Sequence, residues 1–197
     1  MPRLFTGLEV PAEIAESLSM MRGGLVGARW IDAENYHVTL RFMGDIDDHS
    51  ARDVYHMLAD VRRPPLTLTL DGLSTFGGDK PRALVARIKP DPALIEFQAE
   101  QERIVRRAGL PPEKRKFTPH VTLARLRDTT PWHVSDFLAG QGHVPSRSFT
   151  AKRFVLFSSR ASVGGGPYVV EAAYPFGAPA RPDTSWSASS RAASSAL

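Results

Sequence analysis

One tetrapeptide occurs twice in the chain and contains residue types that can move protons. The sequence His-Val-Thr-Leu occupies residues 37–40 and again residues 120–123. Side chains alternate between the two faces of a β-strand, so His37 and Thr39 would share one face, as would His120 and Thr122. The aliphatic residues between them would point to the opposite face, towards a core. Two such strands lying side by side would gather two imidazoles and two hydroxyl groups at one surface.

This set of groups suits in-line displacement at phosphorus. The unperturbed pKa of histidine, ~6.5, leaves both protonation states accessible near neutral pH. A neutral imidazole can take a proton from the attacking water while an imidazolium gives one to the leaving oxygen, and each contributes ~10²–10⁴-fold to the rate. Threonine hydroxyls can donate to the non-bridging phosphate oxygens, where transition-state charge must be held. The scheme requires no metal ion.

The functional interpretation depends on the two histidines occurring as a matched pair, because either one alone would more often be a structural residue. The other histidines, His49, His56, His133 and His143, lie on or beside expected helices and are assigned surface or structural roles. Other catalytic motifs are missing: the chain contains no cysteine, no G-x-x-x-x-G-K-[ST] phosphate loop, no H-E-x-x-H metal motif and no G-x-S-x-G elbow. Thiolate chemistry is therefore excluded, and the paired histidines are the best-supported candidate site.

Hydrophobic patterning and turn residues predict strands and helices in a mixed order. Residues 66–70, Leu-Thr-Leu-Thr-Leu, alternate with the period of a half-buried strand, and Asp91-Pro92 is typical of a helix start. Residues 28–31 and 36–43 are expected to pair with each other. The order lacks strict βαβα alternation, which favours an α+β fold with antiparallel sheets. The expected strands cover residues 3–9, 28–31, 36–43, 66–70, 82–89, 119–126, 148–158 and 167–174, and the expected helices lie within 11–22, 51–61, 92–108 and 131–138.

The composition is that of a globular protein with a basic balance. The 197 residues are 42% apolar and 23% charged with a net charge of +4, and no apolar run reaches the ~18–20 residues of a membrane span. We therefore expect no membrane partner and a cytoplasmic location. Basic residues cluster from Arg103 to Lys116, just before His120, which favours a polyanionic partner. An Ala/Ser/Pro-rich end predicts one two-lobed domain over residues 1–177 and a disordered tail over 178–197.

The two motifs and their flanks resemble the 2H phosphoesterase superfamily, in particular its RNA 2′,3′-cyclic phosphodiesterase branch, historically called 2′-5′ RNA ligases. The resemblance is carried by residues 3–11, 35–44 and 117–125 and extends over about residues 3–176. It implies a bilobal α+β fold: two antiparallel sheets with flanking helices around a central groove, in lobes related by a pseudo-twofold that each carry one H-x-T-x strand. It also implies metal-independent, cofactor-free hydrolysis of a terminal 2′,3′-cyclic phosphate of RNA to a 2′-phosphate.

The resemblance also implies roles for the motif residues. His37 would be the proton donor to the leaving 3′ oxygen, and His120 the proton acceptor that activates water. Thr39 and Thr122 would bind the phosphate oxygens. The donor and acceptor labels could be exchanged without any change visible in the sequence.

Four neighbouring residues are candidate substrate contacts. Arg41 has the strand parity of His37, whereas Arg125 would reach the phosphate only where a bulge or the strand end turns it. Tyr36 and Phe42 could stack on a base, although core packing is the more common role for a residue such as Phe42.

The same residues are compatible with other functions. One is ATP-independent 2′-5′ RNA ligation, and another is hydrolysis of a small cyclic nucleotide or of ADP-ribose 1″,2″-cyclic phosphate. A third is an RNA-binding module whose histidines are catalytically inert. In the favoured interpretation the partner is an RNA end or oligonucleotide with a 2′,3′-cyclic phosphate, and the protein is a monomer.

Overall fold

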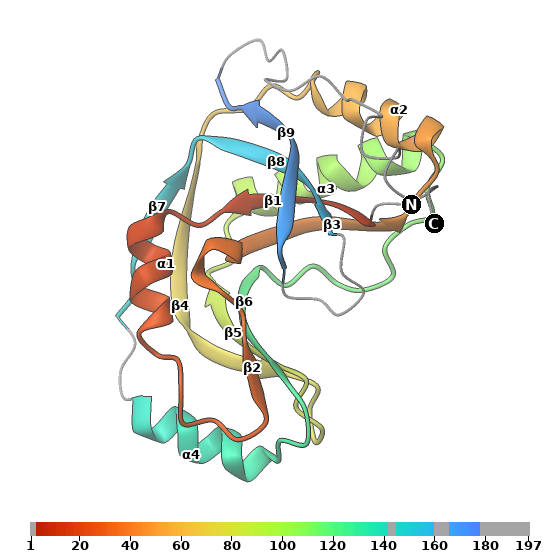
Figure 1. The fold of residues 1–197 in the computed structure, drawn as a ribbon. Helices are drawn as coiled ribbons and strands as arrows, with labels where there is room; N and C mark the ends of the chain where they lie inside the picture. The colour runs from red at the N-terminus through yellow and green to blue at the C-terminus, as the bar shows by residue number, and fades with distance from the viewer. Residues whose placement is uncertain (1–2, 142–144, 160–165, 178–197) are drawn as a thin grey trace, which may run out of the picture.

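The structure is a computed structural model that describes residues 3–141, 145–159 and 166–177. It confirms the expected α+β class, with helices packed on a large antiparallel sheet (Figure 1). The expected tail over residues 178–197, its boundary with the preceding domain, and His143 lie outside the described residues. The strands are β1 (Arg3–Glu9), β2 (Ala28–Trp30), β3 (His37–Asp45), β4 (Leu66–Phe76), β5 (Ala83–Ile88), β6 (His120–Leu126), β7 (Ser148–Ala151), β8 (Arg153–Ser159) and β9 (Tyr168–Pro175). The helices are α1 (Ala12–Ser19), α2 (Asp48–Leu58), α3 (Pro92–Arg107) and α4 (Pro131–Gln141), with a 3-10 turn at Ala33–Asn35.

The order of strands in the sheet is symmetric about its middle. Strands β7, β4, β5 and β6 form one half, and β3, β1, β8 and β9 form the other, with each motif strand innermost in its half. The halves join where Val38 of β3 pairs with Val121 of β6, the second residue of each motif. The two lobes therefore have the pseudo-twofold relation that was expected, and their two sheets are linked through this pair into one continuous sheet.

Two expectations about strand pairing were wrong. Residues 28–31 and 36–43 do not pair with each other: β2 pairs with β6, because β1 occupies one edge of β3 and β6 meets its other edge at Val38. The single strand expected over 148–158 is two strands with different partners. Strand β7 pairs with β4, whereas β8 lies between β1 and β9.

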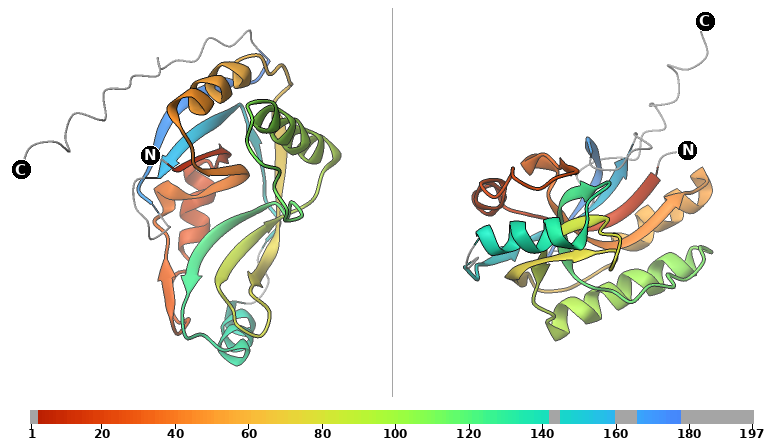
Figure 2. Two further views of the ribbon diagram at one scale, coloured as in Figure 1. Left: turned by 90° about the vertical axis from the view of Figure 1, so that its right-hand side faces the viewer. Right: turned by 90° about the horizontal axis from the view of Figure 1, so that it is seen from below.

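The helices begin where local capping chemistry permits. At α2 the side chain of Asp47 accepts hydrogen bonds from the backbone N–H groups of His49 and Ser50, and at α3 Asp91 accepts from Ala93. Such caps satisfy N–H groups that have no partner inside the helix. Helices α2 and α3 lie side by side at one end of the molecule, with α4 at the other end (Figure 2). No helix in the described ranges is both long enough and apolar enough to span a membrane.

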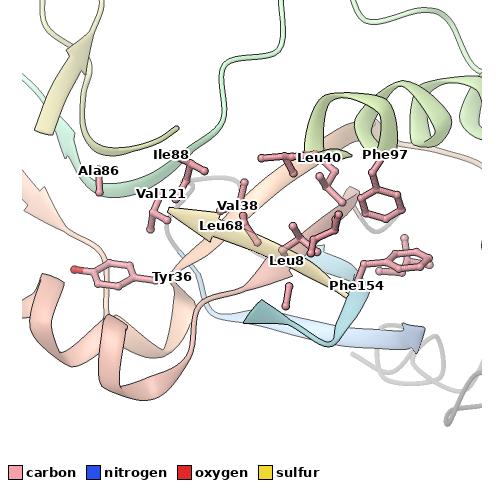
Figure 3. Close-up of a cluster of buried hydrophobic side chains, with 14 of the residues drawn as sticks. Leu8, Tyr36, Val38, Leu40, Leu68, Ala86, Ile88, Phe97, Val121 and Phe154 are labelled. Carbon is pink, nitrogen blue, oxygen red and sulfur yellow. The ribbon is translucent and has the colours of Figure 1, made fainter. Parts of the chain in front are cut away.

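The larger of two clusters of buried hydrophobic side chains among the described residues holds the motif strands in position. Figure 3 shows buried side chains from β1, β3, β4, β5, β6, β8 and α3 packed together. Val38 and Val121 are 0% exposed at its centre, and Leu40 and Leu123 are also buried. Burying each such side chain stabilises the fold by about 1.5–3 kcal/mol, so the aliphatic half of each motif anchors its strand and fixes which face the histidine presents.

Candidate active site

The structure brings the two histidine motifs together on one face of the sheet. His37 and His120 are the first residues of β3 and β6, and the pairing of the adjacent valines sets the register between these strands. Continuing that antiparallel register by one residue in each direction sets His37 across from Thr122 and Thr39 across from His120. All four side chains are half-buried, whereas the intervening aliphatic residues are buried. The alternation inferred from the sequence is confirmed.

Each imidazole is oriented by the same hydrogen bond. Nδ1 of His37 lies 2.8 Å from the carbonyl oxygen of Asn35, and Nδ1 of His120 lies 2.6 Å from that of Thr118. Because a carbonyl oxygen can only accept, each Nδ1 carries the hydrogen and donates it. In the neutral ring Nε2 then holds the lone pair and can accept a proton, and in the imidazolium it can donate one. Both rings are thus prepared for proton transfer through Nε2.

Aromatic side chains surround the imidazole of His37. The ring centroids of Phe5 and Tyr168 lie 4.9 Å from that of His37, and Phe157 lies 5.5 Å away. Strand β9 is tied to the motif as well, because the backbone N–H of Tyr168 donates to the side chain of Asn35. The pKa of His37 is lowered from 6.5 to about 4, mainly by burial and also by the charges of His120 and Arg125, while the bond to Asn35 opposes this shift. His37 is therefore neutral in the free protein near pH 7.

His120 has a similar but more open environment. The ring of Phe76 lies edge-on to it, with 4.7 Å between centroids. Burial lowers the pKa of His120, the bond to Thr118 raises it, and the charge of Arg125 lowers it again. Arg125 thus acts electrostatically on both histidines.

A β-bulge in each motif strand decides which neighbours join the site. Between β1 and β3 the register skips Leu40, and between β5 and β6 it skips Leu123. A bulge inverts the alternation of the residues that follow it. Arg125 and Phe42 therefore come to the histidine face, as their exposure and the buried residues just before them also indicate.

Arg41 is placed on the opposite face, contrary to the expected substrate contact. Its side chain is 5% exposed and forms an ion pair with Glu102 of α3. It also donates hydrogen bonds to the carbonyl oxygens of Phe42 and Pro111. The physical reason is the bulge, which the alternation rule did not include. Through these contacts Arg41 links β3 to α3 and to the loop that follows α3, on the face of the sheet opposite the histidines.

The two aromatic candidates exchange their expected roles. Tyr36 is 3% exposed and belongs to the core, so it does not present its ring to a base (Figure 3). Phe42, for which core packing was the more common role, is 41% exposed and stacks on Phe5 with 6.3 Å between ring centroids. Phe42 therefore offers an exposed aromatic ring on the side of His37, as Phe76, 38% exposed, does beside His120.

Several residues of the site were missed from the sequence. Phe157 on β8 and Phe76 on β4 occupy equivalent positions in the two halves, each beside one histidine. Gly7 on β1 leaves room for the first motif, since a Cβ there would lie 3.0 Å from the carbonyl oxygen of Val38. These residues come from strands far away in sequence, so no local pattern marks them.

The other described histidines lie apart from the motif pair. His49 is on the surface of α2, where it pairs with Asp53, and His133 bonds to Thr130 at the start of α4. Within residues 3–141, 145–159 and 166–177, no three histidine, aspartate or glutamate side chains converge into a cluster that could hold a metal ion.

A family model described as LigT like Phosphoesterase matches residues 8–85 and 88–168 of the chain. The matched residues include both histidine motifs and the strands that carry them. The protein belongs to the LigT-like phosphoesterase family.

Two relatives of this LigT-like phosphoesterase are both named RNA 2′,3′-cyclic phosphodiesterase. The Bacillus subtilis protein is 30% identical over 165 residues, which span 79% of this chain and 87% of the relative. The Aeropyrum pernix protein is 36% identical over 104 residues, which span 52% of this chain and 59% of the relative.

Solved structures share the fold of this LigT-like phosphoesterase. Escherichia coli LigT complexed with 3′-AMP has a TM-score of 0.70 at 24% identity, covering 90% of this chain and 100% of that one. TT0787 of Thermus thermophilus has a TM-score of 0.72 at 21% identity, covering 88% and 97%.

Proposed function

We propose that the protein hydrolyses the 2′,3′-cyclic phosphate at the end of an RNA to a 2′-phosphate, with no metal ion or other cofactor. The observation that carries this proposal is the pair of imidazoles on one sheet face, each with Nδ1 bonded to a backbone carbonyl. Displacement at phosphorus needs one group to remove a proton and one to supply it. The relatives named RNA 2′,3′-cyclic phosphodiesterase support the choice of substrate.

In the proposed reaction His120 accepts a proton at Nε2 from a water molecule as the water oxygen bonds to phosphorus. The bond between phosphorus and the 3′ oxygen breaks, and His37 donates its Nε2 proton to that oxygen. The product has a 2′-phosphate and a 3′-hydroxyl, and proton exchange with solvent restores the starting charges. The pseudo-twofold makes the two histidines equivalent in position, so the geometry also accommodates the reverse assignment.

The remaining polar groups would hold the phosphate. The hydroxyls of Thr39 and Thr122 donate to the non-bridging oxygens, and the guanidinium of Arg125 balances the charge that develops there. The exposed ring of Phe42 offers a stacking surface for the terminal base, a contact typically worth about 1–3 kcal/mol. Arg41 and Tyr36 have no contact with substrate in this scheme.

The cellular setting of the proposed reaction follows from its substrate. RNA ends with cyclic phosphates, or short oligonucleotides that carry them, would be the partners. We expect the protein to act on them in the cytoplasm and as a monomer, since both lobes of one chain contribute to the site.

The test is to incubate the protein with an RNA oligonucleotide that ends in a 2′,3′-cyclic phosphate and to identify the position of the phosphate in the product. We expect a 2′-phosphate, formed equally well in excess chelator. His37→Ala and His120→Ala should each lower kcat by about 10²–10⁴-fold. His49→Ala removes an exposed histidine of α2 and is the matched control.

Three results would contradict the proposal. Loss of activity on chelation would point to a metal enzyme, and a 3′-phosphate product would mean that the other ester bond breaks. Tight RNA binding without turnover, unchanged in both histidine variants, would instead favour an inert binding module.

A further inference from the structure

Asn35 bonds both to the first histidine of the pair and to the strand that covers it. Its backbone carbonyl oxygen accepts the Nδ1 hydrogen of His37 at 2.8 Å. Its side-chain oxygen Oδ1 accepts a hydrogen bond at 3.2 Å from the backbone N–H of Tyr168, a residue 133 positions later in the chain. The backbone N–H of Asn35 donates to the carbonyl oxygen of Asp32, which fixes the turn that precedes β3. One residue therefore links the histidine to β9.

The start of β9 fits closely against the Asn35 side chain. A Cβ at Gly166 would lie only 2.6–2.7 Å from three atoms of the Asn35 amide group. The φ angle of Gly166 is 98°, in the region that favours glycine. The amide of Asn35 is thus packed against Gly166 as well as bonded to Tyr168, and the absence of a side chain at residue 166 makes this approach possible.

The ring of Tyr168 lies against the imidazole of His37. The two ring centroids are 4.9 Å apart and the ring planes are at 83° to each other. The same ring is perpendicular to Phe5, with 5.2 Å between centroids, and it packs on the buried cluster that Phe5 forms with Phe157. Because the backbone of Tyr168 is bonded to Asn35, the Asn35 side chain helps to fix where this covering ring lies.

The second histidine has the same backbone bond without the side-chain bond. Thr118 lies two residues before His120, as Asn35 lies two residues before His37, and its carbonyl oxygen accepts from Nδ1 of His120. The side chain of Thr118, however, is exposed and forms no hydrogen bond with another described residue. The chain therefore contains its own comparison, because only the first histidine is followed by a residue pair that bonds across the sheet.

The covering ring is also particular to the first half of the site. Strand β7 takes the place in its half that β9 takes in the other, but it pairs with Leu66–Thr69, at the end of β4 that lies away from Phe76. Phe76 is 38% exposed, whereas the equivalent Phe157 is 6% exposed. Among the described residues, no second ring lies beside His120 as Tyr168 does beside His37.

We propose that Asn35 is a positioning residue, which orients the imidazole of His37 with its backbone carbonyl and holds the ring of Tyr168 against that imidazole with its side chain. Asn35 acts through His37 and has no contact with the phosphate. Accurate placement matters, because a shift of about 1 Å in a reacting group can lower a rate about 10²-fold. The inference rests on the proposed function for its kinetic test, whereas its spectroscopic test needs no turnover.

The spectroscopic test is an NMR titration of His37 in Asn35→Ala, with the ring signals assigned from the spectrum of His37→Gln. Burial is the largest cause of the lowered pKa of His37, so a looser Tyr168 should raise this pKa by about one unit or more towards 6.5. The nuclear Overhauser contact between the two rings should weaken in parallel. The variant changes none of the charged or titratable groups around His37, which are His120 and Arg125 of β6, Glu9 of β1 with its partner Arg153 of β8, and Tyr168 of β9.

The kinetic test is kcat on the cyclic-phosphate RNA oligonucleotide, measured at the pH of its maximum. Asn35→Ala should lower kcat about 10- to 100-fold and change KM less than about threefold, because the lost contacts orient a reacting group and do not bind substrate. Tyr168→Leu should give a similar loss, and Tyr168→Phe, which retains the ring, should recover most of it. The matched control is Glu34→Ala, which removes an exposed side chain from the same turn and should leave kcat and the His37 pKa unchanged.

A wild-type value of either the His37 pKa or kcat in Asn35→Ala would overturn the proposal. So would equal shifts of the His37 and His120 signals, because these would indicate a general loosening of the fold, and so would a shift of the His37 signal in Thr118→Ala. If Asn35→Ala does not fold, Tyr168→Leu decides by the same titration, since it keeps both hydrogen bonds of Asn35. If the wild type hydrolyses no cyclic phosphate, the proposed function fails and the positioning role is judged by the titration alone.

Discussion

The pH dependence of kcat/KM tests the electrostatics of the paired histidines. The pKa of His37 is lowered from 6.5 to about 4, with burial as the largest cause, and burial also lowers the pKa of His120. The reaction needs one imidazole protonated and the other neutral, so kcat/KM decreases as pH rises above the higher of the two free-enzyme pKa values. Both are below 6.5, and we therefore expect kcat/KM to fall about tenfold per pH unit above roughly pH 6.5. This holds whichever histidine is the acid.

The pH profile of kcat should lie at higher pH than that of kcat/KM, because kcat reports the pKa values of the histidines in the enzyme–substrate complex. A phosphate anion about 4 Å from an imidazolium stabilises it by about 4 kcal/mol at an effective dielectric constant of ~20, which corresponds to about three pKa units. Bound substrate is thus expected to offset the depression of the His37 pKa. We expect the descending limb of kcat to lie about two to three pH units above that of kcat/KM.

The assay is initial-rate measurement on the cyclic-phosphate RNA oligonucleotide from pH 4.5 to 8.5 at constant ionic strength. Arg125→Gln removes a positive charge that lowers both pKa values, so its kcat/KM profile should shift to higher pH even though the maximum is reduced. His49→Gln should leave the profile in place. A wild-type kcat/KM that is flat or rising between pH 6.5 and 8 would refute the reasoning, because it would mean that the free histidines are not depressed.

Three further predictions concern stability and binding. As pH is lowered from 6.5 to 4, the unfolded chain binds a proton at His37 before the folded protein does, so the free energy of unfolding should decrease. Measured by urea unfolding, this decrease should be about 1–2 kcal/mol larger in the wild type than in His37→Gln. The complete pKa shift corresponds to about 3 kcal/mol, which is reduced here because the His37 ring is only half-buried. Arg41→Met removes the ion-pair partner of Glu102 and should lower the free energy of unfolding by about 3 kcal/mol. The double variant Arg41→Met with Glu102→Gln should recover a substantial part of this loss. If it recovers none, the ion pair is not the cause of the loss. Phe42→Ala should raise KM for the RNA substrate about 5- to 100-fold with little change in kcat, and an unchanged KM would exclude base stacking on this ring.

Local patterns predicted much of the fold. The alternation in residues 66–70 and the cap at Asp91 correspond to β4 and α3, because strand periodicity and helix capping depend on residues that are close in sequence. The pairing of β2 with β6 could not be predicted in this way. It depends on which edge remains open after β1 and β6 have taken their places beside β3, and this is a property of the assembled sheet.

For the site, the sequence by itself determined which side chains of the two motifs lie on the catalytic face of the sheet. His37, Thr39, His120 and Thr122 share a side because a strand alternates with period two, and the aliphatic residues between them supply the anchor in the core. Only the tertiary structure decided the surroundings. A bulge inserts one unpaired residue relative to a neighbouring strand, so it exists only once two strands have paired, and it is the bulges that turn Arg41 inward and bring Phe42 and Arg125 to the histidines.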